Sequence, residues 1–421
     1  MPFGFYIIMA AQFFSALADN ALLIAAIAAL REMQAPPELE PLLKTSFTLS
    51  YVLLAAFVGA FADSMPKWRV MFISNTIKIV GCAMMFFSVN PLIAYAVVGL
   101  GAAAYAPAQY GILTEYLPHR LLVVANGWIE GLTVGAIILG VLVGGLLISP
   151  NVAQALLNFD LPIIDTGIDS VGEITIAIIG VFYVLAALFN LYVPDTGVDH
   201  KALSKNPFFL IHEFNHCLKL LWRDRLGQIS LAVTTLFWGA GATLQFIVIK
   251  WSEAALNLDL SKSSMLQGVV AIGVAAGAIM AAKRITLRKS VSVIPMGIAM
   301  GLIVLVMNFV TNFWVAVPLL VIIGYMSGYF VVPMNALLQH RGHILMGAGH
   351  SIAVQNFNEN LSILIMTGLY YLMMRLDFSI YTVITLFALF VAGSMYLVKR
   401  RFEANQREHD DVAHLNDNLS H

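Results

Sequence analysis

Runs of about twenty apolar residues recur along the whole chain and limit its fold more than any other feature. A helix needs about 20 apolar residues to cross the hydrocarbon core of a bilayer. Pro, Gly or charged residues bound each run. We therefore expect an all-α membrane protein with twelve transmembrane helices, at 3–31, 43–63, 69–89, 91–116, 121–149, 172–193, 226–251, 264–284, 291–310, 313–338, 346–374 and 378–398.

The composition agrees with a polytopic membrane protein. Hydrophobic residues make up 60% of the 421 residues and charged residues only 11%, with a mean hydropathy of +0.84, whereas soluble domains carry roughly 25% charged residues. The net charge of -1 gives no basic field for nucleic acid. Cys82 and Cys217 make no disulfide framework. The first run lacks a basic start and a small-residue cleavage site, so we expect a retained helix and no signal peptide.

Lysine and arginine predict the orientation, because loops on the cytoplasmic side are enriched in both. Most of them fall in alternate loops, and the opposite loops are acidic or hold few of them. The stretch 150–173 holds four acidic residues and no Lys or Arg. Both termini are therefore expected on the cytoplasmic side. The basic loops contain Lys67, Arg69, Arg120, Lys201, Lys205, Lys219, Arg223, Arg225, Lys283, Arg284, Arg288, Lys289, Arg341, Lys399, Arg400 and Arg401.

The longest expected cytoplasmic connection divides the helices six and six. It predicts an N-terminal half at 1–193, a linker at 194–225, a C-terminal half at 226–401 and a polar cytoplasmic tail at 402–421. Apolar residues of the linker can share one face of a helix, which indicates an amphipathic helix along the inner leaflet. They are Phe208, Phe209, Ile211, Phe214, Leu218, Leu221 and Trp222.

Two pairs of similar segments indicate parallel six-helix repeats. "VANGWIEGLTVG" in the fifth expected helix resembles "AVQNFNENLSIL" in the eleventh, and Asn126 and Gln355 each precede a glutamate by four residues. Pro107-Ala108-Gln109 in the fourth helix corresponds to Pro333-Met334-Asn335 in the tenth. Both pairs are offset by six helices.

The stretch "GAFADSMPKWRV" links the second and third expected helices. Gly59, Asp63, Lys67 and Arg69 resemble the motif G-x-x-x-D-[RK]-x-G-[RK]-[RK] of the major facilitator superfamily, although Ser64 and Pro66 depart from it. A carboxylate at a helix end beside basic residues on a tight loop can act as a conformational latch in a rocking transporter. The alternative is an ordinary interfacial loop.

Asp19, Lys78, Glu130 and Glu359 are ionisable residues within the hydrophobic spans, away from their ends. Each costs about 2.5–3.5 kcal/mol on the insertion scale, and such residues normally face a bundle interior or a cavity. They are therefore candidates for a substrate pathway. The alternative is a structural network between helices, for instance Asp19 with Lys78.

Longer strings tighten the resemblance. "AQFFSALADNALL", "GAAAYAPAQYGIL", "ANGWIEG", "FWGAGATLQF", "YFVVPMNALLQHRG" and "AVQNFNENLS" are together similar to the bacterial lysophospholipid transporter family. The resemblance implies a major facilitator fold of two six-helix halves in the cytoplasmic membrane. It implies that lysophosphatidylethanolamine and related lysolipids move from the outer to the inner leaflet. There a separate acyltransferase, with its acyl-carrier-protein synthetase activity, would restore the missing acyl chain.

The zwitterionic head group that this family implies suggests roles for the polar residues. Carboxylates at Asp19, Glu130 and Glu359 suit an ammonium group, while Lys78, Asn20, Gln109, Gln245 and Asn358, with Gln355 nearby, could serve the phosphate. Some members of the family carry Lys and Arg where this chain has Gln109 and Gln245, which puts a role for those cations in question here. No cofactor is expected, and the transporter is expected to be a monomer.

"HEFNH", from His212 to His216, matches the H-E-x-x-H pattern of zinc proteases. It lies on the expected linker helix without an evident third ligand, so we expect no metal site and no enzyme. The chain also lacks the G-x-x-x-x-G-K-[ST] pattern of ATP hydrolysis. The main alternative function is a proton-coupled exporter of drugs or small metabolites, because the fold alone does not fix the substrate. A membrane protease or integral acyltransferase is the alternative from a different class.

Overall fold

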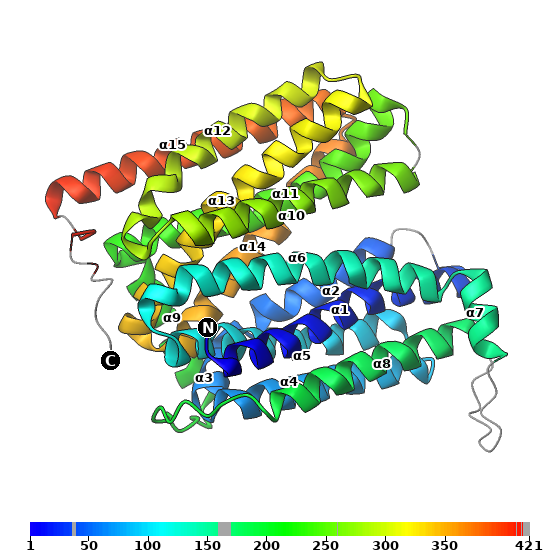
Figure 1. Ribbon diagram of the computed structural model, residues 1–421, viewed down its shortest axis with the longest axis horizontal. Coiled ribbons are helices and arrows are strands. Elements are labelled where there is room, and N and C mark those ends of the chain that lie inside the picture. Colours follow the sequence, from blue (N-terminus) through cyan, green and yellow to red (C-terminus); the bar gives the residue numbers. More distant parts are fainter. Residues whose placement is uncertain (36–38, 159–169, 259, 410, 414, 416–421) are drawn as a thin grey trace. The chain divides into compact units, whose positions relative to one another are not determined.

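The computed structural model describes residues 1–35, 39–158, 170–258, 260–409, 411–413 and 415 (Figure 1). Its regular structure is helical, and the expected all-α class is confirmed. The residues pack into two compact units. The first unit comprises Met1–Ile112 and Gly135–Ile211, and the second comprises Leu113–Val134 and His212–His421.

The first unit is built around α1 (Phe3–Glu32) and α8 (Val171–Asn190), which run antiparallel beside each other (Figure 1). Phe14 of α1 stacks on both Phe182 and Phe189 near the end of α8, at ring distances of 6.2 and 5.8 Å. The other helices of this unit are α2 (Leu39–Leu53), α3 (Ala55–Asp63), α4 (Lys67–Phe86), α5 (Pro91–Tyr116) as far as residue 112, the second part of α6 (Leu122–Leu147), and α7 (Pro150–Leu157).

Small residues bring α6 against α1. A Cβ atom added to Gly140 would lie 2.6 Å from the carbonyl oxygen of Leu17 and 2.9 Å from the Cβ of Asn20. A Cβ atom added to Gly144, one turn later, would lie 3.0 Å from the carbonyl oxygen of Ala21. Helix association in lipid depends on such close backbone approach, since lipid is as apolar as the side chains.

The second unit contains the end of α5, the start of α6, and the helices from residue 212 onward. Its core is apolar and includes the fully buried Trp251, whose Nε1 donates to the carbonyl oxygen of Met307 at 2.9 Å. The elements are α9 (Pro207–Arg223) from residue 212, α10 (Arg225–Leu256), α11 (Leu260–Arg284), η2 (Leu287–Val293), α12 (Ile294–Val304), η3 (Leu305–Phe309), α13 (Phe313–Met346), α14 (Ala348–Arg375) and α15 (Ile380–Glu408).

The most extensive helix pair of the second unit, α11 with α13, also depends on glycine. A Cβ at Gly277 would lie 2.0 Å from the carbonyl oxygen of Tyr325, and a Cβ at Gly328 would lie 2.0 Å from that of Val274. Each helix therefore offers a backbone groove to the other, and any larger side chain at these positions would separate them.

Ten of the described helices are long and apolar enough to cross a membrane, and eleven if the bent pair α2–α3 counts as one span. The expected helix 43–63 is broken near Leu54, with a bend of 62°. The expected span 346–374 is helical as α14, yet it is not among the ten because its first half is rich in His, Ser, Asn and Gln. A count of twelve is compatible with these elements, and the chain is a multi-pass membrane protein.

Candidate functional site

A buried ion pair lies at the centre of the first unit. The Nζ atom of Lys78 on α4 lies 2.7 Å from Oδ2 of Asp19 on α1. The Lys78 side chain is only 2% exposed, whereas 15% of the Asp19 side chain remains accessible. Removing one partner of such a pair would leave an uncompensated buried charge, at a cost of about 3–5 kcal/mol.

Three neighbouring side chains form hydrogen bonds with these two residues, and a fourth bonds to one of the three. The hydroxyl of Tyr183 on α8 donates to Oδ1 of Asp19 at 2.7 Å. Tyr95 donates to the backbone oxygen of Asp19 at 3.3 Å. Lys78 also donates to Ser15 at 2.9 Å, and the Ser15 hydroxyl donates to Oδ1 of Asn75 at 2.9 Å.

On α4 and α5, three buried polar atoms have no hydrogen-bond partner among the described residues. They are Nδ2 of Asn75, the hydroxyl of Tyr105 and Nε2 of Gln109. The three side chains are at most 3% exposed. The Lys78 ammonium lies 5.2 Å from the centroid of the Tyr105 ring. An unsatisfied buried donor costs about 1–3 kcal/mol. Tyr105 and Asn75 lie around the Lys78 cation and Gln109 lies one turn from Tyr105, so an anionic oxygen-rich group would suit these donors.

Helical spacing explains how the sequence assembles this cluster. Ser15 and Asp19 are four residues apart on α1, and Tyr105 and Gln109 are four apart on α5, so each pair shares a helix face. Gly101 extends the α5 face by one more turn. A Cβ added there would lie 2.7 Å from Cγ of Lys78, so glycine lets α5 approach the lysine stem closely.

Asn20 follows Asp19 on α1 but faces another neighbour. Its Nδ2 donates to the carbonyl oxygen of Ala16 at 2.8 Å, and its Cβ lies where α6 approaches α1 at Gly140. The structure therefore joins Asp19 and Lys78 directly, places Gln109 one turn along α5 from Tyr105, and places Asn20 at the adjoining α1–α6 contact.

The second unit has its own buried polar cluster on α13 and α14. Nε2 of Gln355 donates to Oε1 of Glu359 at 2.8 Å and to Oδ1 of Asn335 at 3.2 Å. All three side chains are at most 6% exposed. Two expected site residues, Gln355 and Glu359, are thus in direct contact.

Asn358 and Gln245, two further candidates of the second unit, have other hydrogen-bond partners. Asn358 accepts a hydrogen bond from Nε1 of Trp222 on α9 at 3.3 Å. Gln245 on α10 has an exposed side chain, and its backbone oxygen accepts from Gln267 at 3.0 Å. Glu130 lies in α6, but its side chain is outside the described residues.

The expected latch residues lie around the turn between α3 and α4. Lys67 forms an ion pair with Asp63 at 2.7 Å and donates to the carbonyl oxygen of Ala62 at 2.7 Å. The Asp63 backbone oxygen accepts from the amide of Lys201 at 3.0 Å. Arg69 is exposed and lies over the Trp68 ring, 5.2 Å from its centroid. Gly59 is buried in α3.

The HEFNH stretch lies on α9, and its residues face different ways. His212 and His216 are exposed, whereas Glu213 faces His350 of α14, with 3.6 Å between Oε2 and Nε2. Within the described ranges, no group of three or more His, Cys, Asp or Glu is arranged to hold a metal ion.

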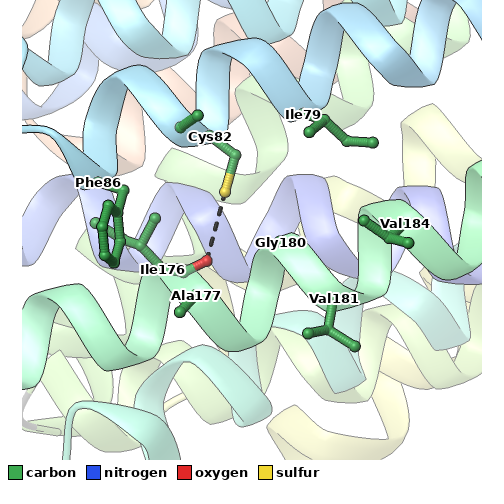
Figure 2. Close-up of a pocket in the computed structure, with 9 residues that line it drawn as sticks. Ile79, Cys82, Phe86, Ile176, Ala177, Gly180, Val181 and Val184 are labelled. Carbon is green, nitrogen blue, oxygen red and sulfur yellow. Dashed lines mark hydrogen bonds between the residues drawn. The ribbon is translucent and has the colours of Figure 1, made fainter. Parts of the chain in front are cut away.

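An apolar groove opens between α4 and α8 (Figure 2). Its lining includes Ile79, Phe86, Gly180 and Val184, and Figure 2 shows Cys82 donating across it to the carbonyl oxygen of Ile176, at 3.5 Å. Among the described residues, its lining is uncharged. It therefore offers only van der Waals contact.

Sequence reasoning missed several members of the first cluster: Ser15, Asn75, Tyr95, Tyr105 and Tyr183. Serine and tyrosine are common in membrane helices, so their types alone carried no signal. Spacing did carry one for three of them, because Ser15, Asn75 and Tyr105 each lie three or four residues from a candidate on the same helix.

Comparisons with known proteins agree with the fold and the motifs. Residues 8–366 match the family model of the Major Facilitator Superfamily. The chain is 40% identical over 369 residues to the lysophospholipid transporter LplT of Serratia proteamaculans, covering 87% of this chain and 88% of that protein. It is 39% identical over 370 residues to LplT of Yersinia pestis, covering 88% and 86%.

Solved structures share the fold at low identity. The E. coli fucose:proton symporter FucP aligns with a TM-score of 0.70 and 14% identity, covering 94% of this chain and 98% of that chain. The human organic anion transporter MFSD10 aligns with a TM-score of 0.73 and 14% identity, covering 96% and 100%. These comparisons confirm the expected resemblance: the chain belongs to the Major Facilitator Superfamily and, within it, to the lysophospholipid transporter family.

Proposed function

We propose that this chain moves lysophospholipids, lysophosphatidylethanolamine among them, from the outer to the inner leaflet of the bacterial cytoplasmic membrane by alternating access. Two relatives at about 40% identity bear the name lysophospholipid transporter, which supports the substrate class. The superfamily fold supports transport and not an enzyme reaction.

The observation that carries the proposal is the donor-rich neighbourhood of Lys78. A phosphate diester group accepts several hydrogen bonds, and charge-assisted bonds are roughly twice as strong as neutral ones. The Lys78 ammonium, Tyr105 hydroxyl and Gln109 amide are all donors, and two of them lack a partner among the described residues. A lipid phosphate entering this neighbourhood would satisfy both.

Asp19 suits the other charge of the head group. Its side chain is the more accessible member of the ion pair. A phosphate drawn to Lys78 would loosen the Asp19–Lys78 contact and leave the carboxylate for the ammonium of ethanolamine. The Asp19 carboxylate would then pair with the lipid ammonium, and the Lys78 ammonium with the lipid phosphate. No charge would be left unpaired in the apolar bundle.

In the second unit, Glu359 is the matching candidate. The amide of Gln355 donates to its carboxylate and also to Oδ1 of Asn335, and all three side chains are buried. We propose that Asn20, Gln245, Asn358 and Glu130 line other parts of the pathway. Both termini face the cytoplasm in this proposal, and the transporter is a monomer whose product passes to a separate acyltransferase.

Leaflet-specific uptake of labelled lysophosphatidylethanolamine tests the function. Proteoliposomes containing the purified chain would receive the lipid in the outer leaflet only, and back-extraction with albumin would report what has moved inward. We expect inward movement well above that of protein-free liposomes. A rate equal to theirs contradicts the proposal. Proton-driven export of a dye by the same liposomes, without lipid movement, would favour the exporter alternative.

A further inference from the structure

A second pocket lies at the opposite end of the α1–α8 pair from Phe14, where α1 ends and α8 begins. It has a volume of about 440 Å³. Its apolar wall includes Ile27, Ala28 and Ile176, and Arg31 and Glu32 stand at its charged side. None of these residues takes part in the Asp19–Lys78 cluster.

The sequence explains why a hollow forms here. The end of α1 reads "AAIAALRE", and the first turn of α8 contains Gly172. Ala25, Ala28 and Ala29 all line the pocket, so the side chains that would fill the space between the two helices are short. Helices packed through small residues normally approach each other until the gap closes, but here an open pocket remains.

The two charges stand beside the apolar wall. Arg31 and Glu32 are exposed and end the apolar run of α1. The Glu32 carboxylate reaches over the first turn of α8, where its Oε2 lies 3.8 Å from the place that a Cβ of Gly172 would take. A cation and an anion thus border one side of a cavity whose remaining lining is largely apolar.

This combination matches one class of molecule. A single-chain zwitterionic phospholipid carries an ammonium, a phosphate and one acyl chain, and Glu32, Arg31 and the apolar wall complement the three in turn. The position also fits, since the last residues of a spanning helix lie at the level of the lipid head groups.

We infer that the pocket between the end of α1 and the start of α8 is a capture site for a zwitterionic lysophospholipid. This inference rests on the proposed function for its ligand and adds a first binding step at the expected outer surface. The groove between α4 and α8 does not qualify, because its described lining residues are uncharged.

Photolabelling in proteoliposomes tests the inference directly. The probe is lysophosphatidylethanolamine with a diazirine in its acyl chain, and mass spectrometry locates the labelled peptides. We expect labelling within residues 24–32 and 171–176, displaced by unlabelled lysophosphatidylethanolamine but not by diacyl phosphatidylethanolamine. Ala28→Phe fills the pocket and should reduce this labelling at least fivefold, with a raised KM for transport and an unchanged maximal rate. Ala177→Phe, which projects into the α4–α8 groove, is the matched control and should change neither.

Glu32→Gln supplies a second variant that keeps the shape of the pocket. It should weaken labelling by lysophosphatidylethanolamine several-fold and leave labelling by lysophosphatidic acid, which has no ammonium, unchanged. Equal displacement by the diacyl lipid would identify an ordinary bilayer-lipid position and overturn the inference. Labelling that persists in Ala28→Phe would overturn it as well.

The outcomes separate this inference from the proposed function. Wild-type protein that transports the lipid but shows no displaceable label at these peptides contradicts the capture site alone. Displaceable label without any transport contradicts the proposed function and supports the pocket.

Discussion

Asp19 and Lys78 hold each other in place, so a substitution of either residue alone has two consequences. Asp19→Asn keeps the size of the side chain but removes the charge that balances a lysine only 2% exposed. Part of its effect will therefore appear as lost stability, and part as lost transport. The two effects can be separated by measuring the unfolding temperature and the transport per folded molecule independently.

We expect Asp19→Asn to lower the unfolding temperature of the purified protein and to weaken lysophosphatidylethanolamine transport strongly. The loss of a charge-assisted contact to the ammonium is worth about 1–3 kcal/mol, or about five- to a hundredfold in affinity. Transport is measured per folded molecule, by uptake divided by the monodisperse fraction in size-exclusion chromatography.

The double variant Asp19→Asn with Lys78→Gln provides the control. It removes both charges, so stability should recover while transport stays low. Recovery of both would show that the pair is purely structural. Lysophosphatidylglycerol, which has no ammonium, should lose less transport in Asp19→Asn if the carboxylate binds the amine; equal losses for the two lipids would point to gating or ion coupling.

At the residue scale, the sequence singled out Asp19 and Lys78 but did not predict how their side chains are held. A carboxylate in an apolar run is conspicuous, and Asp19 and Lys78 stand out for that reason. The hydroxyl of Tyr183 and the amide of Asn75 do not, because neither carries a charge whose burial is costly. Their role depends on the register between α1, α4 and α8, which no single apolar run encodes.

At the element scale, the start of α6 is attached closely to α11 and α13. Asn126 and Gln339 exchange two amide hydrogen bonds, at 2.9 and 3.0 Å, and both side chains are fully or almost fully buried. A Cβ added to Gly127 would lie 2.4 Å from the Cβ of Ala282 on α11. This attachment belongs to the second unit and includes residues 113–134 from the N-terminal part of the chain.

We therefore expect Gly127→Val to destabilise the protein by about 1–3 kcal/mol, because the added side chain forces α6 and α11 apart. Gly131→Val, one turn along the same helix, is the matched control, since nothing lies within 4 Å of a Cβ added there. Thermal unfolding of the two purified variants checks the prediction, and equal melting temperatures would contradict it.

Helix limits were the most predictable feature at this scale, since they follow from runs of apolar residues. The break near Leu54 was not predictable, because no Pro or Gly stands there. The first half of α14 shows a different limit of this reasoning, because it is a buried helix segment with a polar sequence. His350, Gln355 and Glu359 make this half polar. Their burial is tolerated because each has a partner inside the second unit.

At the scale of the whole molecule, each unit buries a polar cluster of its own inside an apolar helical core. Asp19 and Lys78 anchor one cluster, and Gln355 and Glu359 anchor the other. The sequence repeat drew attention to Gln355 and Glu359, whereas Asp19 and Lys78 stood out as charges in apolar runs; the contacts within each cluster required coordinates. A transporter that alternates between two access states needs more than candidate binding groups. It also needs contacts that favour one access state until the substrate binds.

The turn between α3 and α4 is our candidate for that holding element, and Asp63→Asn is its test. The Asp63–Lys67 pair lies at a helix end, with the aspartate side chain 16% exposed. Asn keeps the hydrogen-bond acceptor, and Lys67 keeps its bond to the carbonyl oxygen of Ala62. Folding should therefore survive, while the loss of the ion pair removes a preference between access states.

We expect near-normal expression and unfolding temperature for Asp63→Asn, with transport per folded molecule reduced several-fold. A population shift of 1.4 kcal/mol already changes the ratio of two states about tenfold, so a small local loss has a large effect on turnover. Asp63→Glu, which retains the charge, is the matched control and should keep more activity. If expression and per-molecule activity fall together, the turn serves folding; if Asp63→Asn transports as well as wild type, this ion pair does not bias the access states at all.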